Sequence, residues 1–94
     1  MTDKQYYQQS IEANAEKNNG DVVCEECGIV ITYPTGRNVC HVIGKGADIR
    51  LYHHPENHFI LCHKHAIQEE SHYKKKMRIY SKWLLKSIKL KSIR

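Results

Sequence analysis

Two pairs of residues in this sequence have the spacing of metal ligands. The first pair is Cys24 and Cys27 and the second is Cys62 and His65, and two residues separate the members of each pair. Zn²⁺ prefers four tetrahedral nitrogen or sulfur ligands, and this spacing lets both side chains of a pair converge on one ion. Gly28 follows the first pair, as expected where backbone N–H groups must close around thiolate sulfurs. The pattern therefore predicts one structural zinc site.

Two alternatives to this assignment need to be considered. An isolated Cys-x-x-Cys sequence can be a redox pair, but such a pair ordinarily lies at a helix start in a βαβ chain longer than these 94 residues. His63 could replace His65 as the fourth ligand, although it directly follows Cys62 and so converges less easily on the same ion. A chain this short buries little apolar surface, so a metal would also supply stability that the core lacks.

A second group of residues lies between the two pairs, in the segments 38–43 and 54–62 on either side of a Gly-rich loop. The arrangement resembles the HNH endonuclease family over about residues 24–68, and within it the phage recombination endonucleases of the NinG type. By this resemblance His41 matches the histidine that activates water, and Asn57 matches the asparagine that orients it. The resemblance also implies an HNH-like ββα-metal core, a two-stranded hairpin closed by a helix.

The activity implied by the resemblance is metal-dependent hydrolysis of DNA phosphodiesters, including branched or recombination DNA. An imidazole with an ordinary pKa of about 6.5 is partly neutral at neutral pH, so His41 could serve as the general base. Mg²⁺ or Mn²⁺ would stabilise charge on the phosphate and on the leaving oxygen. We expect Asn57 to hold the His41 ring through its side-chain carbonyl oxygen.

Two positions depart from the family pattern. Cys40 stands where the family commonly has an Asp or His that binds the catalytic metal, and a thiolate is a poor ligand for magnesium. Ala66 stands where many members have a second metal-binding histidine. The spare histidines that could substitute are His53, His54, His58 and His63. These departures favour the alternative of a non-cleaving HNH-fold zinc module that binds nucleic acid or a phage protein.

The individual residues also have plain structural interpretations. His41 could be a satisfied histidine inside a small hairpin, and Asn57 could be a turn residue whose side chain caps the backbone. Cys40 fits a small buried side chain better than a nucleophile. The functional interpretation of these residues is favoured because a metal-ligand pair lies on each side of them, in the same order as in the family.

Positive charge is concentrated towards the C-terminus. Residues 73–94 contain nine Lys or Arg and no acid, whereas residues 1–36 contain two Lys and six acidic residues, and the net charge is +5. A solvated helix face is one explanation, but phosphate would relieve the self-repulsion of such a helix, so DNA is the expected partner. The residues expected to contact phosphate are Lys45, Arg50, Lys74, Lys75, Lys76, Arg78 and Lys82.

The expected architecture is one small α+β domain over residues 1–94. Its parts are an N-terminal helix within 1–19, a zinc-knuckle core over 20–72 and a basic amphipathic helix over 73–94. Thr2 can cap the first helix, whose apolar side would consist of Tyr7, Ile11 and Ala15. In the last helix apolar residues recur every three or four positions, which suggests a docking stripe for a second copy or a phage protein. That stripe is Tyr73, Met77, Tyr80, Leu84 and Ile88.

The core should contain three short strands. β-Branched residues favour strands at 29–33 and 39–43, and a buried strand at 59–61 should deliver Cys62 to the start of a helix. Residues 49–52 are expected to be extended or irregular.

No apolar run approaches the roughly 20 residues of a membrane span, and the N-terminal residues are polar rather than signal-like. We therefore expect no membrane partner and a cytoplasmic location, and the resemblance to phage endonucleases implies that the cell is a phage-infected or lysogenic bacterial host.

Overall fold

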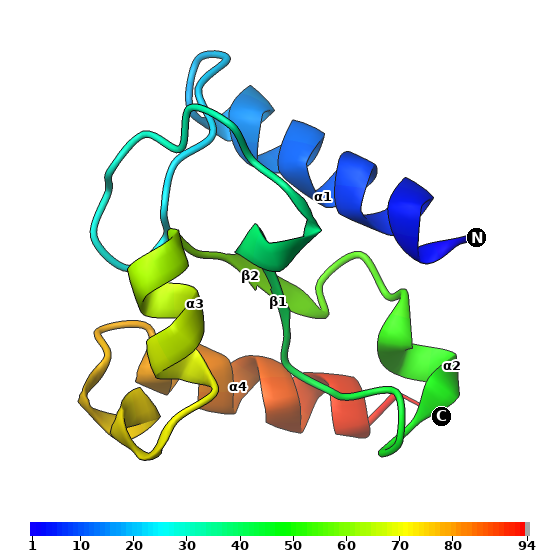
Figure 1. Cartoon of the computed structure of the whole chain (residues 1–94). Helices are drawn as coiled ribbons and strands as arrows, with labels where there is room; N and C mark the ends of the chain where they lie inside the picture. The colour runs from blue at the N-terminus through cyan, green and yellow to red at the C-terminus, as the bar shows by residue number, and fades with distance from the viewer. Residues whose placement is uncertain (94) are drawn as a thin grey trace.

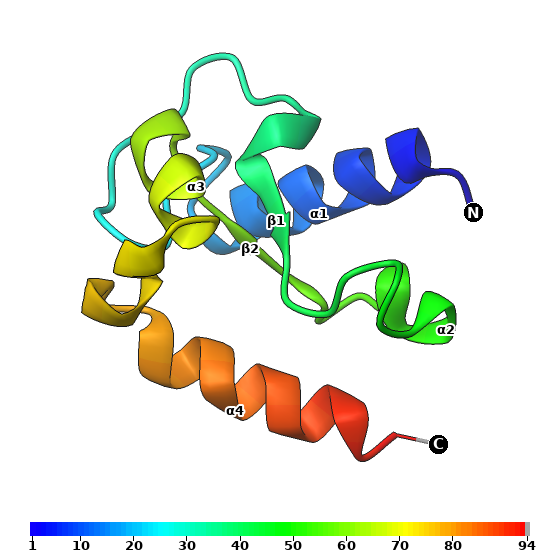
Figure 2. The same cartoon turned by 60° about the horizontal axis from the view of Figure 1, so that its bottom comes forward.

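A two-stranded antiparallel sheet lies between a long N-terminal helix and a C-terminal helix (Figure 1, Figure 2). The computed structural model describes residues 1–93 and contains both helices and strands, which confirms the predicted small α+β class. Two further short helices lie at opposite ends of the sheet (Figure 1). The elements are α1 (Asp3–Lys17), η1 (Gly36–Asn38), β1 (Val39–His41), α2 (Ile49–Tyr52), β2 (His58–Ile60), α3 (His63–Glu69), η2 (His72–Lys76) and α4 (Tyr80–Lys91).

Helix α1 begins directly after its predicted cap, Thr2, and ends within the predicted range 1–19. The Thr2 hydroxyl accepts a hydrogen bond from the Gln5 backbone N–H at 3.2 Å, and the Gln5 side chain accepts from the Thr2 N–H at 2.8 Å. This reciprocal capping satisfies two of the free N–H groups at the helix start.

The buried face of α1 is displaced by one residue from the predicted apolar side. Tyr7 and Ile11 pack only at its edge, whereas the buried positions are Tyr6, Ser10 and Asn14. Asn14 explains the shift because its amide donates to the Val23 carbonyl at 3.0 Å and accepts from the Val23 N–H at 2.8 Å. A polar contact with a distant backbone therefore sets the rotation of this helix.

The predicted strand at residues 29–33 is wrong. Only an isolated bridge between Val23 and Val30 forms there, and Tyr33 is 86% exposed. The chain reverses at Gly28, whose φ of +78° a residue with a side chain would adopt only with strain. After this turn the segment pairs only with residues 22–24, through bonds from the Cys24 N–H to the Ile29 carbonyl and from the Ile31 N–H to the Val22 carbonyl, and this pairing is too short to make a strand.

The other two strands form a short hairpin ladder. Strand β1 pairs with β2 in the register Val39 to Ile60, Cys40 to Phe59 and His41 to His58. Strand β1 is shorter than predicted and β2 begins one residue earlier. Residues 49–52, expected to be extended or irregular, instead form α2, because the Asp48 side chain accepts from the Arg50 N–H at 3.0 Å and caps a helical turn.

The predicted continuous helix over 73–94 is also wrong. The chain forms η2, passes through an extended Met77, and only then begins α4. The carboxylate of Glu26 accepts hydrogen bonds from the Arg78 N–H at 2.8 Å and the Ile79 N–H at 2.9 Å. A side chain more than 50 residues away in sequence therefore caps the start of α4.

The predicted apolar stripe of the C-terminal segment breaks up as a result. Met77 is buried, but Leu84 and Ile88 are 41% and 67% exposed. The face of α4 directed into the core consists of Trp83, Ser87 and Leu90. It packs against a core cluster that includes Phe59, Leu61 and Ile79.

Candidate metal centre and the adjoining hollow

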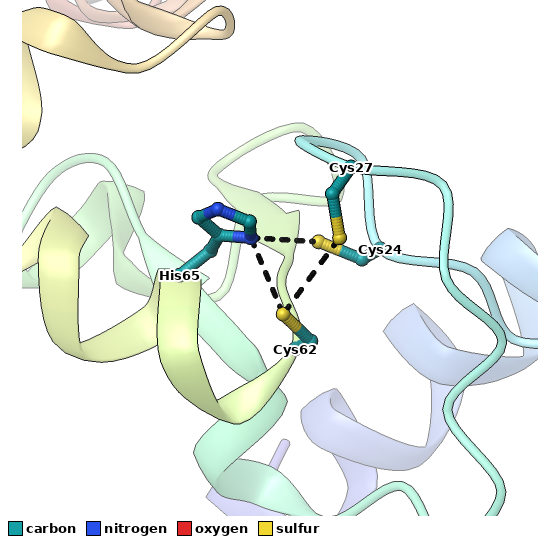
Figure 3. A group of neighbouring side chains, drawn as sticks. All are labelled: Cys24, Cys27, Cys62 and His65. Carbon is teal, nitrogen blue, oxygen red and sulfur yellow. Dashed lines mark hydrogen bonds between the residues drawn. The ribbon is translucent and has the colours of Figure 1, made fainter.

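The four predicted metal ligands lie together at one end of the sheet (Figure 3). Cys24 and Cys27 come from the turn after α1, and Cys62 and His65 come from the start of α3. Their ligand atoms all lie within 4.8 Å of one another. The Cys27 Sγ to Cys62 Sγ distance is 3.9 Å, and His65 Nδ1 lies 3.3 Å from Cys62 Sγ and 3.8 Å from Cys24 Sγ. These side chains are close enough to bind a metal ion.

The distances can be compared with those of a tetrahedral site. Ligand bonds of about 2.0 to 2.3 Å place neighbouring ligand atoms about 3.3 to 3.8 Å apart, which is near the separations observed. The ring of His65 directs Nδ1 towards the three sulfurs (Figure 3). His63, the alternative ligand, is exposed at the first position of α3 and lies outside the group. In the described part of the chain no other cluster of three or more such ligands occurs.

The turn that carries Cys24 and Cys27 is held by its own backbone. The Gly28 N–H donates to the Cys24 carbonyl at 2.9 Å, and the Cys24 N–H donates to the Ile29 carbonyl at 2.9 Å. A backbone hydrogen bond from Ile29 lowers the pKa of Cys27, while burial raises the pKa of Cys24. Both thiols would be deprotonated on binding a metal.

An open hollow with a volume of ≈ 1100 Å³ is lined by residues of α1, β1 and α3 and by the loop after β1. Its lining includes Tyr7, Arg37, Cys40, His41, Lys45, Tyr52, Glu69 and Glu70. His41, the predicted base, therefore shares one concavity with two cations and two carboxylates. Arg37 and the two glutamates were not among the predicted site residues.

The ring of His41 is held between aromatic rings. It stacks on Tyr52 with centroids 4.0 Å apart and planes 7° apart, and Tyr6 lies parallel at 5.1 Å and 20°. Burial lowers the pKa of His41, and the charge of His53 lowers it further. Its Nε2 is buried with no hydrogen-bond partner among residues 1–93. The imidazole is therefore neutral at pH 7 and keeps one ring nitrogen unused.

Asn57 does not hold this ring, so that part of the prediction is wrong. The Asn57 side chain is fully buried and donates to the carbonyls of Ile43 at 2.9 Å and Tyr52 at 3.2 Å. Its oxygen accepts from the Ile43 N–H at 2.6 Å. These bonds fasten both ends of the loop between the strands, so Asn57 positions Tyr52, and through Tyr52 the His41 ring.

Cys40 and Ala66, the two departures from the family pattern, are both buried. Burial raises the pKa of Cys40 to about 12, so this group remains a thiol at neutral pH. Ala66 offers no ligand, but Glu69 and Glu70 follow it by three and four residues, a spacing that places side chains on the same side of a helix. This spacing is the signal in the sequence that could have identified them.

Burial also affects the first of these carboxylates. Glu69 is 8% exposed, its pKa is raised by burial, and the Lys74 ammonium lies 3.8 Å from its Oε1. Glu70 is exposed at the end of α3. The hollow therefore offers one paired carboxylate and one that solvent reaches.

The predicted phosphate-contacting residues fall into three groups. Lys45 lies on the lining of the hollow, 3.8 Å from the Asp3 carboxylate, whereas Arg50 is paired with Asp48 at 3.0 Å. In the C-terminal segment two lysines pack on aromatic rings, Lys74 over Trp83 at 3.9 Å and Lys76 over Tyr73 at 5.3 Å. The remaining predicted residues are exposed, and they are Lys75, Arg78 and Lys82.

Comparisons with protein-family models, with curated proteins and with solved structures found no match to this chain. Over the range 1–93, no helix combines the length and the apolar character needed to cross a membrane. Function is therefore inferred from the residues and their geometry.

Proposed function

We propose that this chain is a metal-dependent DNA endonuclease whose β1, β2 and α3 form an HNH-like core. The observation that supports this most strongly is the position of His41. It ends β1 inside a hollow that also contains Arg37, Lys45 and the carboxylates of α3. A neutral imidazole beside cations and carboxylates matches the requirements of phosphodiester hydrolysis.

Zinc is the ion we propose for the four-ligand group. Three thiolates and one imidazole suit Zn²⁺ and disfavour magnesium and calcium, which prefer oxygen ligands. Four protein ligands complete a tetrahedral site and leave no position for a substrate. The zinc therefore has a structural role, joining the turn after α1 to the start of α3.

The chain's own residues supply most of the proposed mechanism. His41 accepts a proton from the attacking water, and Arg37 and Lys45 neutralise charge on the scissile phosphate. Tyr52 holds the His41 ring in plane, and Asn57 holds Tyr52.

A catalytic Mg²⁺ or Mn²⁺ would stabilise the leaving oxygen. Magnesium is commonly bound by one or two carboxylates together with water and substrate phosphates, so Glu70, with Glu69 beside it, fits as its donor. Cys40 does not fit, because it remains a buried thiol.

The proposed substrate is DNA, including branched or recombination intermediates, and the proposed setting is the cytoplasm of a phage-infected or lysogenic bacterium. Both follow from the resemblance to phage recombination endonucleases. The exposed cations of the C-terminal segment are consistent with a phosphate-rich partner.

The test is nicking of supercoiled plasmid by zinc-loaded protein with added Mg²⁺ or Mn²⁺. The His41→Ala variant is expected to lose activity by about a hundredfold or more, as for removal of a general base. His63→Ala is the matched control, because His63 is an exposed histidine outside both sites. Equal nicking by His41→Ala and wild type, purified identically, would exclude the assignment.

A non-cleaving module that binds DNA or a phage protein is the second candidate. It is favoured by Cys40 and Ala66, which occupy two positions where the family has catalytic metal ligands. Titration of zinc-loaded protein with Mn²⁺, followed by electron paramagnetic resonance, separates the two candidates. The module would be favoured if the protein binds DNA but binds no Mn²⁺, whether or not DNA is present.

The exposed apolar residues of α4 are compatible with a second copy or a phage protein as a docking partner. They are Leu84 and Ile88, which belong to the predicted stripe, and Leu85, which does not. This partner remains a proposal alongside either candidate.

A further inference from the structure

A second, smaller pocket lies between η2 and α4. Its volume is ≈ 350 Å³, and its lining consists of Ser71, Lys74, Lys75, Tyr80 and Trp83. The pocket thus combines two aromatic rings with two lysines and a serine. Neither the zinc group nor the proposed chemistry at His41 accounts for this combination.

The two rings of the pocket have nearly parallel faces. Tyr80 and Trp83 differ by 3° in orientation, and their centroids are 6.3 Å apart. Both residues are half-buried, so each presents part of its ring at the surface. The Lys74 ammonium lies 3.9 Å from the Trp83 centroid and covers one face of the indole. This face is therefore occupied by a cation, and a planar ligand would have to displace Lys74 in order to stack there.

The charge around the pocket favours an anionic ligand. Lys75 is exposed, and no acidic residue occurs in residues 73–94. The Glu69 carboxylate beside the pocket is paired with Lys74 at 3.8 Å. A ligand that suits the pocket therefore has a planar aromatic part for the rings and a negative charge for Lys75.

The pocket also adjoins the hollow that contains His41. Glu69 lines the hollow, and its ion-pair partner Lys74 lines the pocket. One Glu–Lys pair thus separates the two concavities. A polymer with a phosphate in the hollow could extend a neighbouring unit into the pocket.

We propose that this pocket binds an unpaired nucleobase of single-stranded DNA, stacked on Trp83 and Tyr80 with its phosphate on Lys75. Nucleobases stack on aromatic side chains regardless of sequence, and lysines along the strand neutralise its backbone. A base in a duplex already has both faces covered, so the pocket selects single-stranded or splayed DNA. The incoming base displaces the Lys74 ammonium from the indole, and Lys74 retains Glu69 as its partner.

This proposal deepens the proposed function, because an endonuclease with such a subsite would prefer junctions, flaps or frayed ends over intact duplex. Binding at the pocket does not require cleavage, however. The two ideas can therefore be tested with separate measurements.

Trp83 is the single tryptophan of the chain, so intrinsic tryptophan fluorescence reports on this pocket alone. Zinc-loaded wild-type protein without added Mg²⁺ or Mn²⁺ is titrated with three probes of equal length. These are oligothymidylate, an abasic oligomer with the same phosphates, and a blunt duplex. Stacking predicts strong quenching by oligothymidylate and little by the other two.

Variants extend the test with the fluorescence anisotropy of labelled oligothymidylate. Loss of a stacking ring is expected to weaken binding about fivefold to more than a hundredfold. Because Trp83 also packs on the core, Tyr80→Ala is the primary variant and Trp83→Ala is secondary. Tyr73→Ala removes an exposed ring outside the pocket and is the matched control, with unchanged binding expected.

Three results would overturn the proposal. Equal quenching by all three probes would mean that phosphates alone disturb Trp83. Binding of oligothymidylate without quenching would place the strand at another site. Absence of binding would show that single-stranded DNA is not the ligand. Plasmid nicking without quenching would eliminate only this pocket, whereas quenching without nicking would leave the pocket and eliminate the enzyme.

Discussion

Cys62 has two functions at one position. Its thiol belongs to the metal group, and its carbonyl accepts the Ala66 N–H at 2.8 Å, which forms the first turn of α3. Cys40 is buried, whereas Cys62 is half-buried, and Cys40 is not part of the metal group. Substitutions at the two positions therefore distinguish the loss of a metal ligand from the loss of a buried thiol.

We expect Cys62→Ala to lose its zinc and Cys40→Ala to retain it. Zinc binding in small domains contributes about 10–16 kcal/mol of folding free energy, so the Cys62 variant should be largely unfolded. Native mass spectrometry measures the bound zinc, and circular dichroism measures the fold. Zinc retention by Cys62→Ala would contradict the assigned ligand set.

Protonation of His58 makes the free energy of unfolding depend on pH. Burial, together with the charge of Lys86, lowers its pKa to about 4, whereas the pKa in the unfolded chain is about 6.5. Above a pH of about 6.5, His58 is neutral in both the folded and the unfolded chain, so the free energy of unfolding keeps its full value. Part of it is lost as the pH falls from about 6.5 to about 4, since the unfolded chain takes up the proton first.

The expected loss is at most about 3 kcal/mol over this pH range. Urea unfolding of wild type and His58→Gln between pH 7 and pH 4 measures it. The variant should show a shallower decrease, which separates His58 from acid-induced release of the metal. The exposed His63→Gln should follow wild type; identical curves for wild type and His58→Gln would show that His58 does not contribute.

Individual residues differ in how well the sequence predicted them. The metal group was predictable because a two-residue spacing within each pair is a local property. The contacts of Asn57 were not, because its partners are backbone groups of Ile43 and Tyr52, whose positions depend on the folded loop. Glu69 and Glu70 were not predicted because they lie one helical turn beyond Ala66, the position at which the family pattern has a metal ligand.

Among the elements, α4 depends most on a distant residue. Its N-cap position, Ile79, offers no side-chain hydrogen bond, and the Glu26 carboxylate supplies the missing acceptors. Apolar periodicity alone placed the helix start several residues too early and selected the wrong face. A sequence pattern could not identify this cap, since Glu26 lies 52 residues before Arg78 and reaches the start of α4 only in the folded chain.

We expect Glu26→Ala to lower the free energy of unfolding by about 1–2 kcal/mol, as for other lost helix caps. Glu26→Gln should recover part of this, because its amide oxygen still accepts a hydrogen bond but lacks the charge that favours a helix start. Denaturant unfolding monitored by Trp83 fluorescence provides the measurement.

The control for this change is Glu16→Ala, an exposed carboxylate on α1. It should leave the unfolding free energy nearly unchanged. A similar loss for both glutamates would indicate a general charge effect rather than a cap.

At the scale of the molecule, charge is divided between the two ends of the chain. Residues 1–36 carry most of the acidic groups, and residues 73–94 carry only basic ones. Some of these cations have partners within the protein. Lys89 forms an ion pair with Glu56 at 2.9 Å, and the Lys86 ammonium donates to the His58 carbonyl at 2.7 Å. Lys75, Arg78 and Lys82 remain exposed, so they are the best candidates for phosphate contacts.

Binding of single-stranded DNA should therefore weaken steeply with salt. The triple variant Lys75→Ala, Arg78→Ala and Lys82→Ala is expected to reduce the slope of log affinity against log salt by about 2, from three lost phosphate contacts. Lys4→Ala on α1 should leave the slope unchanged. An unaltered slope in the triple variant would show that the phosphate contacts are made by another face of the protein.

The overall class was predictable, and the packing was not. A short metal-stabilised α+β chain follows from composition and from the ligand pairs. The rotation of α1 depends on Asn14, and the break before α4 depends on Glu26, and both contact backbone groups that come near only in the folded chain. Such polar contacts are not encoded in apolar periodicity.

The turn from Cys24 to Cys27 has a consequence for how the chain can be altered in length. Its two cysteines belong to the group of four potential metal ligands. The Glu25 N–H donates to the Ile60 carbonyl, the Glu25 carboxylate accepts from the Ile60 N–H, and Glu26 caps α4. A single inserted residue would put all of these contacts out of register together. The exposed turn at residues 44–47 is different, because a Cβ atom at either of its glycines would meet no neighbour within 4 Å. The fold is therefore expected to tolerate insertions there better than in the turn from Cys24 to Cys27, although an insertion would displace Lys45 from the lining of the hollow.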